Sequence, residues 1–192
     1  EEFRKKYEHH LILKAQDNGI EEMQEYLENT YEVHEFDFFA CNHRESKIAA
    51  LHRFAAAGAA VRFMSLYRDK VSDIIALDIA LRRNDKDWFE NLPEELNDAI
   101  LHKLYYGHFF CHVLHQDYVV KKGNDPVKLK AKMLNILKSR GAKYPAEHNV
   151  GHMYKAEEPL AKFYEQCDPT NTFNPGIGRS SKYECYKKGS KD

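Results

Sequence analysis

Histidines are concentrated in one part of this sequence. Six of the eleven lie between residues 102 and 152, together with the carboxylates Asp117 and Glu147; they are His102, His108, His112, His115, His148 and His152. Histidine titrates near neutral pH, ligates metals and transfers protons, so this group is a candidate catalytic or metal site. The alternative is that some members are ordinary core or surface histidines of a half-buried strand.

The spacing of these histidines limits which of them can meet. On one continuous strand His108 and His112 share a face, whereas His115 points to the other side. We therefore expect a bulge or a turn near Cys111 if His108 and His115 are to converge.

A second candidate is the dipeptide Glu147-His148, which lies between Pro145 and Gly151 in a loop-like stretch. A histidine that removes a proton is helped by a neighbouring carboxylate, which orients the ring or raises its basicity. Taken alone, the dipeptide is weak evidence, because such a pair is usually part of an ordinary polar loop.

Cations accompany small apolar residues in the segment from Glu45 to about Ser65 and just beyond it. They are Lys47, His52, Arg53, Arg62, Arg68 and Lys70. A basic, apolar helix can bind anionic lipid headgroups, and an arginine can hold a substrate carboxylate. The alternative is a packed helix with solvated charges.

The sequence Asn174-Pro175-Gly176 after Asp168-Pro169 indicates tight turns, where Pro fixes φ and Gly permits close backbone approach. Such a turn could be purely structural or could pack against a cofactor. Nothing in the sequence matches a phosphate loop, a nucleophile elbow or a dinucleotide-binding glycine motif.

Composition narrows the class of protein. The chain has 192 residues, 29 Lys+Arg against 30 Asp+Glu, and 43% hydrophobic residues, which favours a globular protein and speaks against a basic nucleic-acid binder. The longest strongly apolar run, Phe54 to Val61, is too short to cross a bilayer. The four cysteines show no metal-site or disulfide spacing, so we expect free thiols. The first residues resemble neither a signal peptide nor a natural start, which suggests a fragment of a longer protein.

Strand and helix signals alternate along the chain and predict an α+β fold. We expect strands at residues 9–14 and 36–41 and over 104–120, and a strand or a helix at 74–80. Helices are expected at 20–31, 45–65, from about 93, and at 126–140 and 157–166. The Pro/Gly-rich end from Gly141 could belong to another domain.

Several long runs resemble bacterial quinone-dependent D-lactate dehydrogenases, which are respiratory, FAD-containing peripheral membrane enzymes. The resemblance covers nearly the whole chain. It rests on residues 7–11, 51–60, 76–85, 102–108, 144–155, 163–164, 168–171 and 174–178.

The resemblance implies an architecture. Residues 1–140 would form a ferredoxin-like cap domain, a layer of helices on a mostly antiparallel sheet, with a membrane-binding element near residues 47–70. Residues 141–192 would complete an FAD-binding domain. FAD itself would be held mostly by an N-terminal domain that is not in this chain, so the isolated chain is expected to be inactive.

The resemblance also implies a reaction: D-lactate is oxidised to pyruvate, and electrons pass through FAD to membrane quinone. His148 would be the base with Glu147 beside it, and His108, His115 and Arg53 would bind the substrate. Asn149, Asn174 and Gly176 would contact the cofactor. Lys47, Arg62, Arg68 and Lys70 would contact anionic lipid at the cytoplasmic side of the inner membrane.

Related flavin dehydrogenases bind a metal through two histidines of a Tyr-Gly-His…His motif and the Glu of a Glu-His pair. Here Tyr106-Gly107-His108 and His115 keep the ends of that motif, but Phe109 to Leu114 replace its polar Gly-Asp-Gly-Asn turn. We therefore assign no metal. Three alternatives stay open: a metal-assisted flavin dehydrogenase of another D-2-hydroxy acid such as 2-hydroxyglutarate, a non-catalytic lipid-docking module, and a metal-binding or structural domain built on the histidines.

Overall fold

The structure is a computed structural model that describes residues 5–31, 36–86, 92–108, 113–146 and 154–187. The chain divides into two compact units, Glu1–Ala55 and Ala56–Asp192, and each is described by itself. The described residues combine helices with an antiparallel sheet, which confirms the predicted α+β class.

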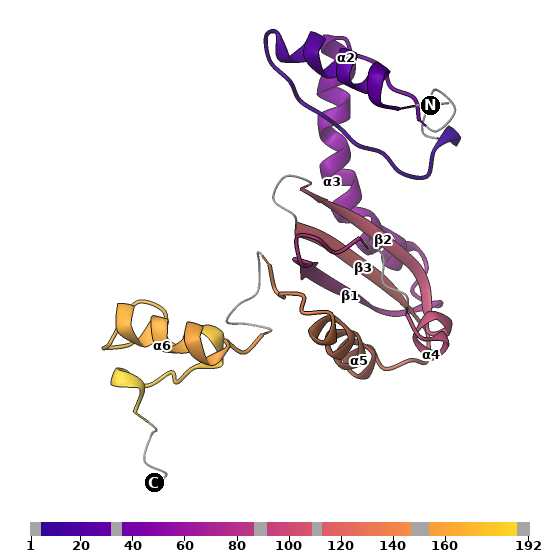
Figure 1. The fold of residues 1–192 in the computed structure, drawn as a ribbon. Coiled ribbons are helices and arrows are strands. Elements are labelled where there is room, and N and C mark those ends of the chain that lie inside the picture. Colours follow the sequence, from indigo (N-terminus) through magenta and orange to yellow (C-terminus); the bar gives the residue numbers. More distant parts are fainter. Residues whose placement is uncertain (1–4, 32–35, 87–91, 109–112, 147–153, 188–192) are drawn as a thin grey trace. The chain divides into compact units, whose positions relative to one another are not determined.

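The first unit contains α2 (Gly19–Thr30) and the beginning of α3 (His43–Leu66) (Figure 1). Both helices were expected from the sequence. The strands predicted at residues 9–14 and 36–41 are wrong, because these residues are irregular. The physical reason is that a strand needs a neighbouring strand for its hydrogen bonds, and no described residue of this unit supplies one.

The start of α3 is set by a reciprocal cap. The side chain of Asn42 accepts a hydrogen bond from the Glu45 amide at 3.0 Å, and the Asn42 amide donates to Glu45 Oε2 at 2.9 Å. This arrangement satisfies two amides that have no partner inside the helix.

The second unit is built on a sheet of three antiparallel strands in the order β1-β3-β2 (Figure 1). The strands are β1 (Val71–Ile79), β2 (Ile100–His108) and β3 (Val113–Lys121), and the short helix α4 (Glu94–Asp98) precedes β2. The single strand predicted over residues 104–120 is wrong, because the chain forms two paired strands there, β2 and β3. Periodicity alone could not show the reversal, since both strands are apolar and aromatic.

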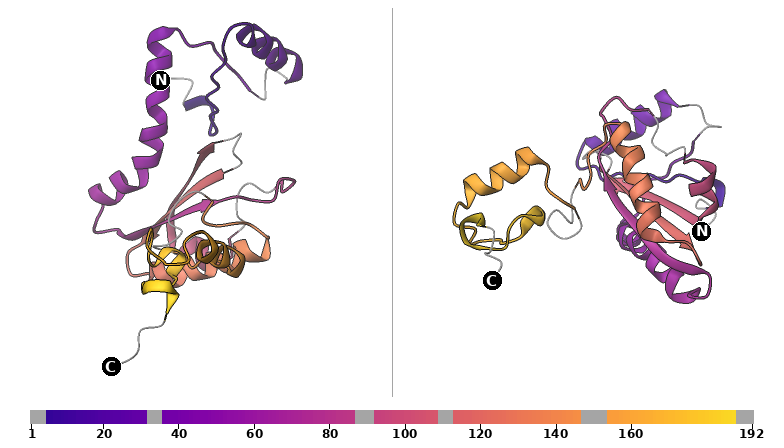
Figure 2. Two further views of the ribbon diagram at one scale, coloured as in Figure 1. Left: turned by 90° about the vertical axis from the view of Figure 1, so that its left-hand side faces the viewer. Right: turned by 90° about the horizontal axis from the view of Figure 1, so that it is seen from below.

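One face of the sheet carries the main core. Ile75, Leu77, Ile79, Tyr118 and Val120 pack there with Leu129, Met133 and Leu137 of α5 (Pro126–Ser139). Figure 2 shows α5 lying along this face. Asp125 caps α5 by accepting hydrogen bonds from the amides of Val127 and Lys128.

The opposite face is covered differently at its two ends. At one end Val71 and Val119 pack with Ala60, Phe63 and Met64 of α3. Toward the other end the side chains become polar, and this polar end is where the candidate site lies.

After α5 the chain returns to the sheet, where Lys143 pairs with Ala80 beside β1. It then forms α6 (Glu158–Cys167) and two short 3-10 turns, Ile177–Arg179 and Glu184–Tyr186. Asp168 organises the loop after α6 by accepting hydrogen bonds from the amides of Thr172 and Phe173. These hydrogen bonds lower the pKa of the Asp168 carboxyl. The cysteines Cys41, Cys167 and Cys185 are free thiols.

Candidate functional site

Three side chains line up across the sheet at its polar end. His115 of β3 pairs with Asp78 of β1 on one side and with Tyr106 of β2 on the other. Because directly opposed residues of antiparallel strands point to the same face, all three project together from the face opposite α5. We call Asp78, Tyr106, His115 and Asp117 the polar row.

The contacts within the polar row are close. His115 Nδ1 lies 2.5 Å from Asp78 Oδ1, and the two side chains are only 13% and 16% exposed. The Tyr106 ring stacks on the His115 ring, with centroids 5.1 Å apart and planes inclined by 27°. The imidazole is therefore held both at its edge and on its face.

Tyr106 also binds a buried carboxylate. Its hydroxyl donates to Asp117 Oδ2 at 3.1 Å, and Asp117 is 6% exposed. Burial raises the pKa of the Asp117 carboxyl, although the Tyr106 hydrogen bond and the nearby His115 lower it in part. Burial, and next the negative charge of Asp117, raise the pKa of the Tyr106 phenol, which therefore stays a donor at neutral pH.

His108 lies at the open end of this arrangement. Its ring is exposed and its centroid is 6.0 Å from that of His115, with the two rings nearly perpendicular. The structure thus brings His108 and His115 close together, which on the sequence alone required a bulge or a turn between them, and it does so by pairing β2 with β3. Cys111 and His112 lie outside the described residues, as does the connection between these strands.

Two members of the polar row have no role in the sequence-based prediction. Asp78 has a detectable signal, since it is the one charged residue in the apolar run Ile74 to Ala80. Tyr106 lies in the quoted Tyr-Gly-His motif, but only the strand register shows that it faces His115.

The remaining predicted catalytic and cofactor residues are spread along the chain. Glu147, His148 and Asn149 lie outside the described residues. Asn174 is exposed, and Gly176 adopts a left-handed conformation in a turn whose amides bond within the turn. Arg53 is exposed on α3 beside the Phe54 ring, in the other compact unit, so its role stays a prediction.

The four cations predicted to bind lipid are all exposed. Lys47 and Arg62 lie on α3, and Arg68 and Lys70 follow it, with Lys70 placed over the Tyr67 ring. Large apolar side chains are exposed along the same segment: Ile48, Leu51, Phe54, Val61, Leu66 and Tyr67. Since soluble proteins rarely expose so many large apolar side chains on one helix, this combination suits a surface that meets lipid or protein.

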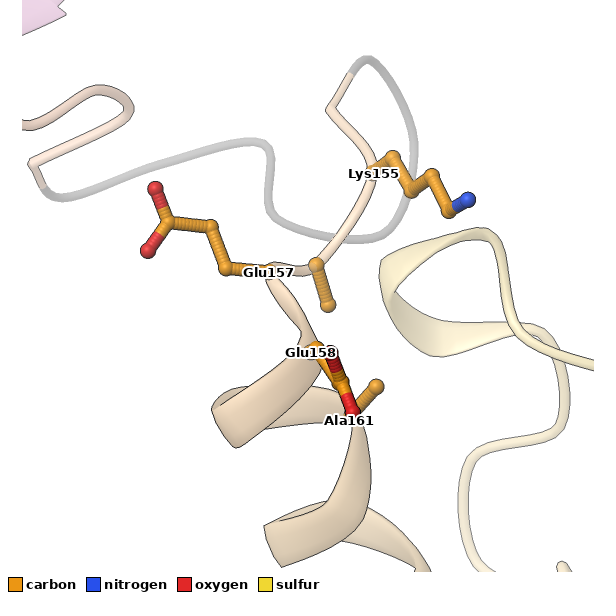
Figure 3. A pocket seen from close by; sticks show the side chains of 5 residues that line it. Lys155, Glu157, Glu158 and Ala161 are labelled. Atoms are coloured by element: carbon orange, nitrogen blue, oxygen red, sulfur yellow. The ribbon is translucent and has the colours of Figure 1, made fainter.

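An open hollow lies at the start of α6, lined by Lys155, Ala156, Glu157, Glu158 and Ala161 (Figure 3). Glu157 pairs with Lys143 at 3.3 Å, and Glu158 pairs with Lys162 at 2.7 Å. These carboxylates are therefore already compensated. Within the described ranges, no three His, Cys, Asp or Glu side chains are grouped as metal ligands would be.

A comparison with known families identifies the chain. A family model described as "D-lactate dehydrogenase, membrane binding" matches residues 1–186. The chain belongs to this family. The membrane-binding character of the family agrees with the exposed cations and apolar side chains of α3. No helix within the described residues is long and apolar enough to cross a membrane.

Three relatives support this family assignment. The chain is 58% identical over 180 residues to the quinone-dependent D-lactate dehydrogenase of Escherichia coli, and 55% identical over 182 residues to that of Haemophilus influenzae. It is 45% identical over 185 residues to that of Corynebacterium glutamicum. These matches cover 94–95% of this chain but 32% of each relative. The chain is thus homologous to part of an oxidoreductase.

Proposed function

We propose that this chain is part of an FAD-containing dehydrogenase that oxidises D-lactate to pyruvate and delivers the electrons to membrane quinone. The observation that carries the proposal is the match of nearly the whole chain to three enzymes named quinone-dependent D-lactate dehydrogenase. Within that enzyme the chain supplies substrate-pocket residues and a surface that binds the membrane.

The proposed architecture has a ferredoxin-like cap, residues 1–140, that covers the substrate. The antiparallel sheet with α5 on one face supports this assignment. Residues 141–192 complete the flavin domain, whose larger part lies elsewhere in the parent protein.

The polar row supports a substrate site on the cap. A 2-hydroxy acid presents a hydroxyl and a carboxylate, and His108 and His115 offer ring nitrogens to such groups from the same face of the sheet. Asp78 and Asp117 add negative charge beside His115, so the cation that binds the substrate carboxylate must come from another element. For this role we retain Arg53, the residue that the family resemblance implies as a carboxylate clamp.

His148 is proposed to take the hydroxyl proton of D-lactate, with Glu147 as its neighbour. FAD supplies the hydride-accepting chemistry when it is bound. The described residues fit only the edge of such a cofactor: the Gly176 amide and carbonyl are both hydrogen-bonded near the turn, and the Lys182 side chain lies beside this glycine. The proposed contacts are therefore the exposed Asn174 side chain and the Gly176 Cα. Asn149 is the third proposed contact.

Membrane docking is proposed for α3 and the residues after it. Lys47, Arg62, Arg68 and Lys70 would attract anionic headgroups, while apolar side chains such as Phe54 enter the interface. We propose that this face lies on the cytoplasmic side of the inner membrane, where quinone is accessible.

The decisive experiment is anaerobic flavin reduction in the full-length enzyme. D-Lactate should bleach the flavin faster than L-lactate or D-2-hydroxyglutarate. Bleaching by D-2-hydroxyglutarate alone would favour the alternative dehydrogenase, and bleaching by none of the acids would refute the proposed activity. His148→Ala should lower the reduction rate with little change in flavin content.

Membrane docking is tested by sedimentation with vesicles containing an anionic phospholipid. Binding should be weaker at high salt and should drop in Phe54→Asp, because the 68% exposed ring would be replaced by a charge. The matched control is Phe173→Asp, another exposed ring, in the loop after α6. Equal binding by the two variants would remove α3 from the docking surface.

A further inference from the structure

We propose that Asp78 is a positioning residue for His115, whose ring orientation and tautomer it determines. This inference rests on the proposed function only in assigning His115 to the substrate. Asp78 is proposed to affect the substrate through His115 and not to touch the substrate itself.

The contact between the two side chains is short and sheltered. Asp78 Oδ1 lies 2.5 Å from His115 Nδ1, and neither side chain is more than 16% exposed. A carboxylate accepts but does not donate, so Nδ1 carries the proton in this pair. In the neutral ring, Nε2 is then the nitrogen with the lone pair, the form that can accept from a substrate hydroxyl.

The backbone of Asp78 is anchored from the other edge of the strand. β1 is paired with β3 on one side, and on the other side the Asp78 carbonyl accepts the Ala146 amide at 2.9 Å. The carboxylate is thus presented by a segment that is hydrogen-bonded along both edges. Such support on regular structure is what holds a functional side chain within a few tenths of an ångström.

The other contacts of His115 leave little freedom to rotate. Tyr106 stacks on the ring, and its hydroxyl is tied to Asp117 at 3.1 Å. A rotation that broke the Asp78 contact would also disturb the stacked ring. The three strands together therefore define one orientation of the imidazole, and Asp78 defines which nitrogen is protonated.

A purely stabilising ion pair is the alternative. Partly buried charge pairs are weak evidence for stability, because desolvation offsets much of their attraction. By contrast, losing a carboxylate that orients a metal-ligating histidine typically costs about 10- to 100-fold in activity, and we expect a loss of that order for the carboxylate that orients His115. Function and folding therefore respond differently to the loss of Asp78.

The test uses the full-length enzyme and the rate of flavin reduction. Asp78→Asn keeps the shape but provides a group that can also donate, so the rate, measured well below the Tm of the variant, should fall about 10- to 100-fold while flavin content stays near that of the wild type. Asp73→Asn is the matched control on the same strand, since Asp73 is exposed and bonds the adjacent Ile74 amide. It should stay within about twofold, as surface substitutions usually do.

A double-mutant cycle with His115→Ala then separates the two roles. If Asp78 acts through His115, Asp78→Asn should cost nothing more once His115 is removed. Additive losses would overturn the proposal, and so would a wild-type rate in Asp78→Asn. If Asp78→Asn folds poorly, Asp78→Glu takes its place and should be impaired to a smaller extent.

A readout independent of catalysis is the acylation of histidines by diethyl pyrocarbonate, followed by peptide mass spectrometry. His115 should be acylated several-fold faster in Asp78→Asn than in the wild type, because its ring is no longer held. His102, which contacts Phe63 and not Asp78, should be unchanged. Unchanged acylation of His115 would overturn the proposal even if every flavin assay failed, whereas failure of D-lactate to reduce the wild-type flavin would refute only the proposed function.

Discussion

The bond between Tyr106 and Asp117 allows a quantitative test of the polar row. The substitution Tyr106→Phe removes one hydroxyl and keeps the ring that stacks on His115. The Tyr106 hydroxyl donates to Asp117 Oδ2 at 3.1 Å, and Asp117 is 6% exposed. The substitution would therefore leave a buried carboxylate without this donor.

The size of the loss follows from the charge of the acceptor. Hydrogen bonds to charged groups contribute about 1.5–3 kcal/mol, so the free energy of unfolding should fall by about that amount near neutral pH. With a urea dependence of about 1–3 kcal/mol per molar, the unfolding midpoint should move down by roughly 1 M.

The loss should depend on pH, and its sign can be worked out. Burial raises the folded-state pKa of Asp117 above 3.8, so the folded state binds more protons than the unfolded state just above that pH. The contribution of Asp117 to the stability of the wild type therefore falls as the pH rises through this window. The Tyr106 hydrogen bond lowers the Asp117 pKa, so removing this bond raises the pKa further. The range over which the Asp117 contribution falls then extends to higher pH. The difference between wild type and variant should be largest at neutral pH and smaller below about pH 4.

Urea denaturation followed by circular dichroism at several pH values measures this difference. Tyr67→Phe is the matched control, because Tyr67 is 40% exposed, and it should change stability by less than about 0.5 kcal/mol. A Tyr106→Phe variant as stable as the Tyr67→Phe control, or a loss of stability that stays constant from about pH 4 to 8, would refute the reasoning.

The remaining predictions concern the same unit and the helix before it. Asp117→Asn should raise the unfolding midpoint at neutral pH and not in acid, because it removes a carboxyl whose pKa burial raises while keeping an oxygen for the hydroxyl; a lower midpoint at both pH values would contradict this. Leu137→Ala, at a fully buried core position, should cost about 2–5 kcal/mol in urea unfolding, whereas Leu66→Ala on exposed surface should cost less than about 1 kcal/mol. Gly107→Ala should destabilise the hairpin and slow flavin reduction in the full-length enzyme, because its Cβ would collide with the Val113 carbonyl oxygen. Gly58→Ala is its control, because the new Cβ would lie in open space, and it should stabilise α3 by about 0.5–1 kcal/mol. A stable, fully active Gly107→Ala variant would contradict the prediction, since it would show that β2 and β3 can separate without cost.

The helices were predictable because their signals are local. Asp125 and Pro126 mark the start of α5, and the Ala-rich run accounts for α3. The expected strands at residues 9–14 and 36–41 failed because aromatic and β-branched residues favour a strand only when a partner is adjacent. The same lack of local information made two strands look like one between residues 104 and 120.

The sequence by itself determined the family, the candidate histidines and the basic, apolar character of α3, because each of these is a matter of residue type and order along the chain. Only the tertiary structure decided that Asp78, Tyr106 and His115 form one row. Residues 78 and 115 are far apart in sequence, and their meeting depends on the register of β1 against β3. Register is set by which faces bury apolar side chains across all three strands at once, and a one-residue slip would turn His115 into the core beneath α5.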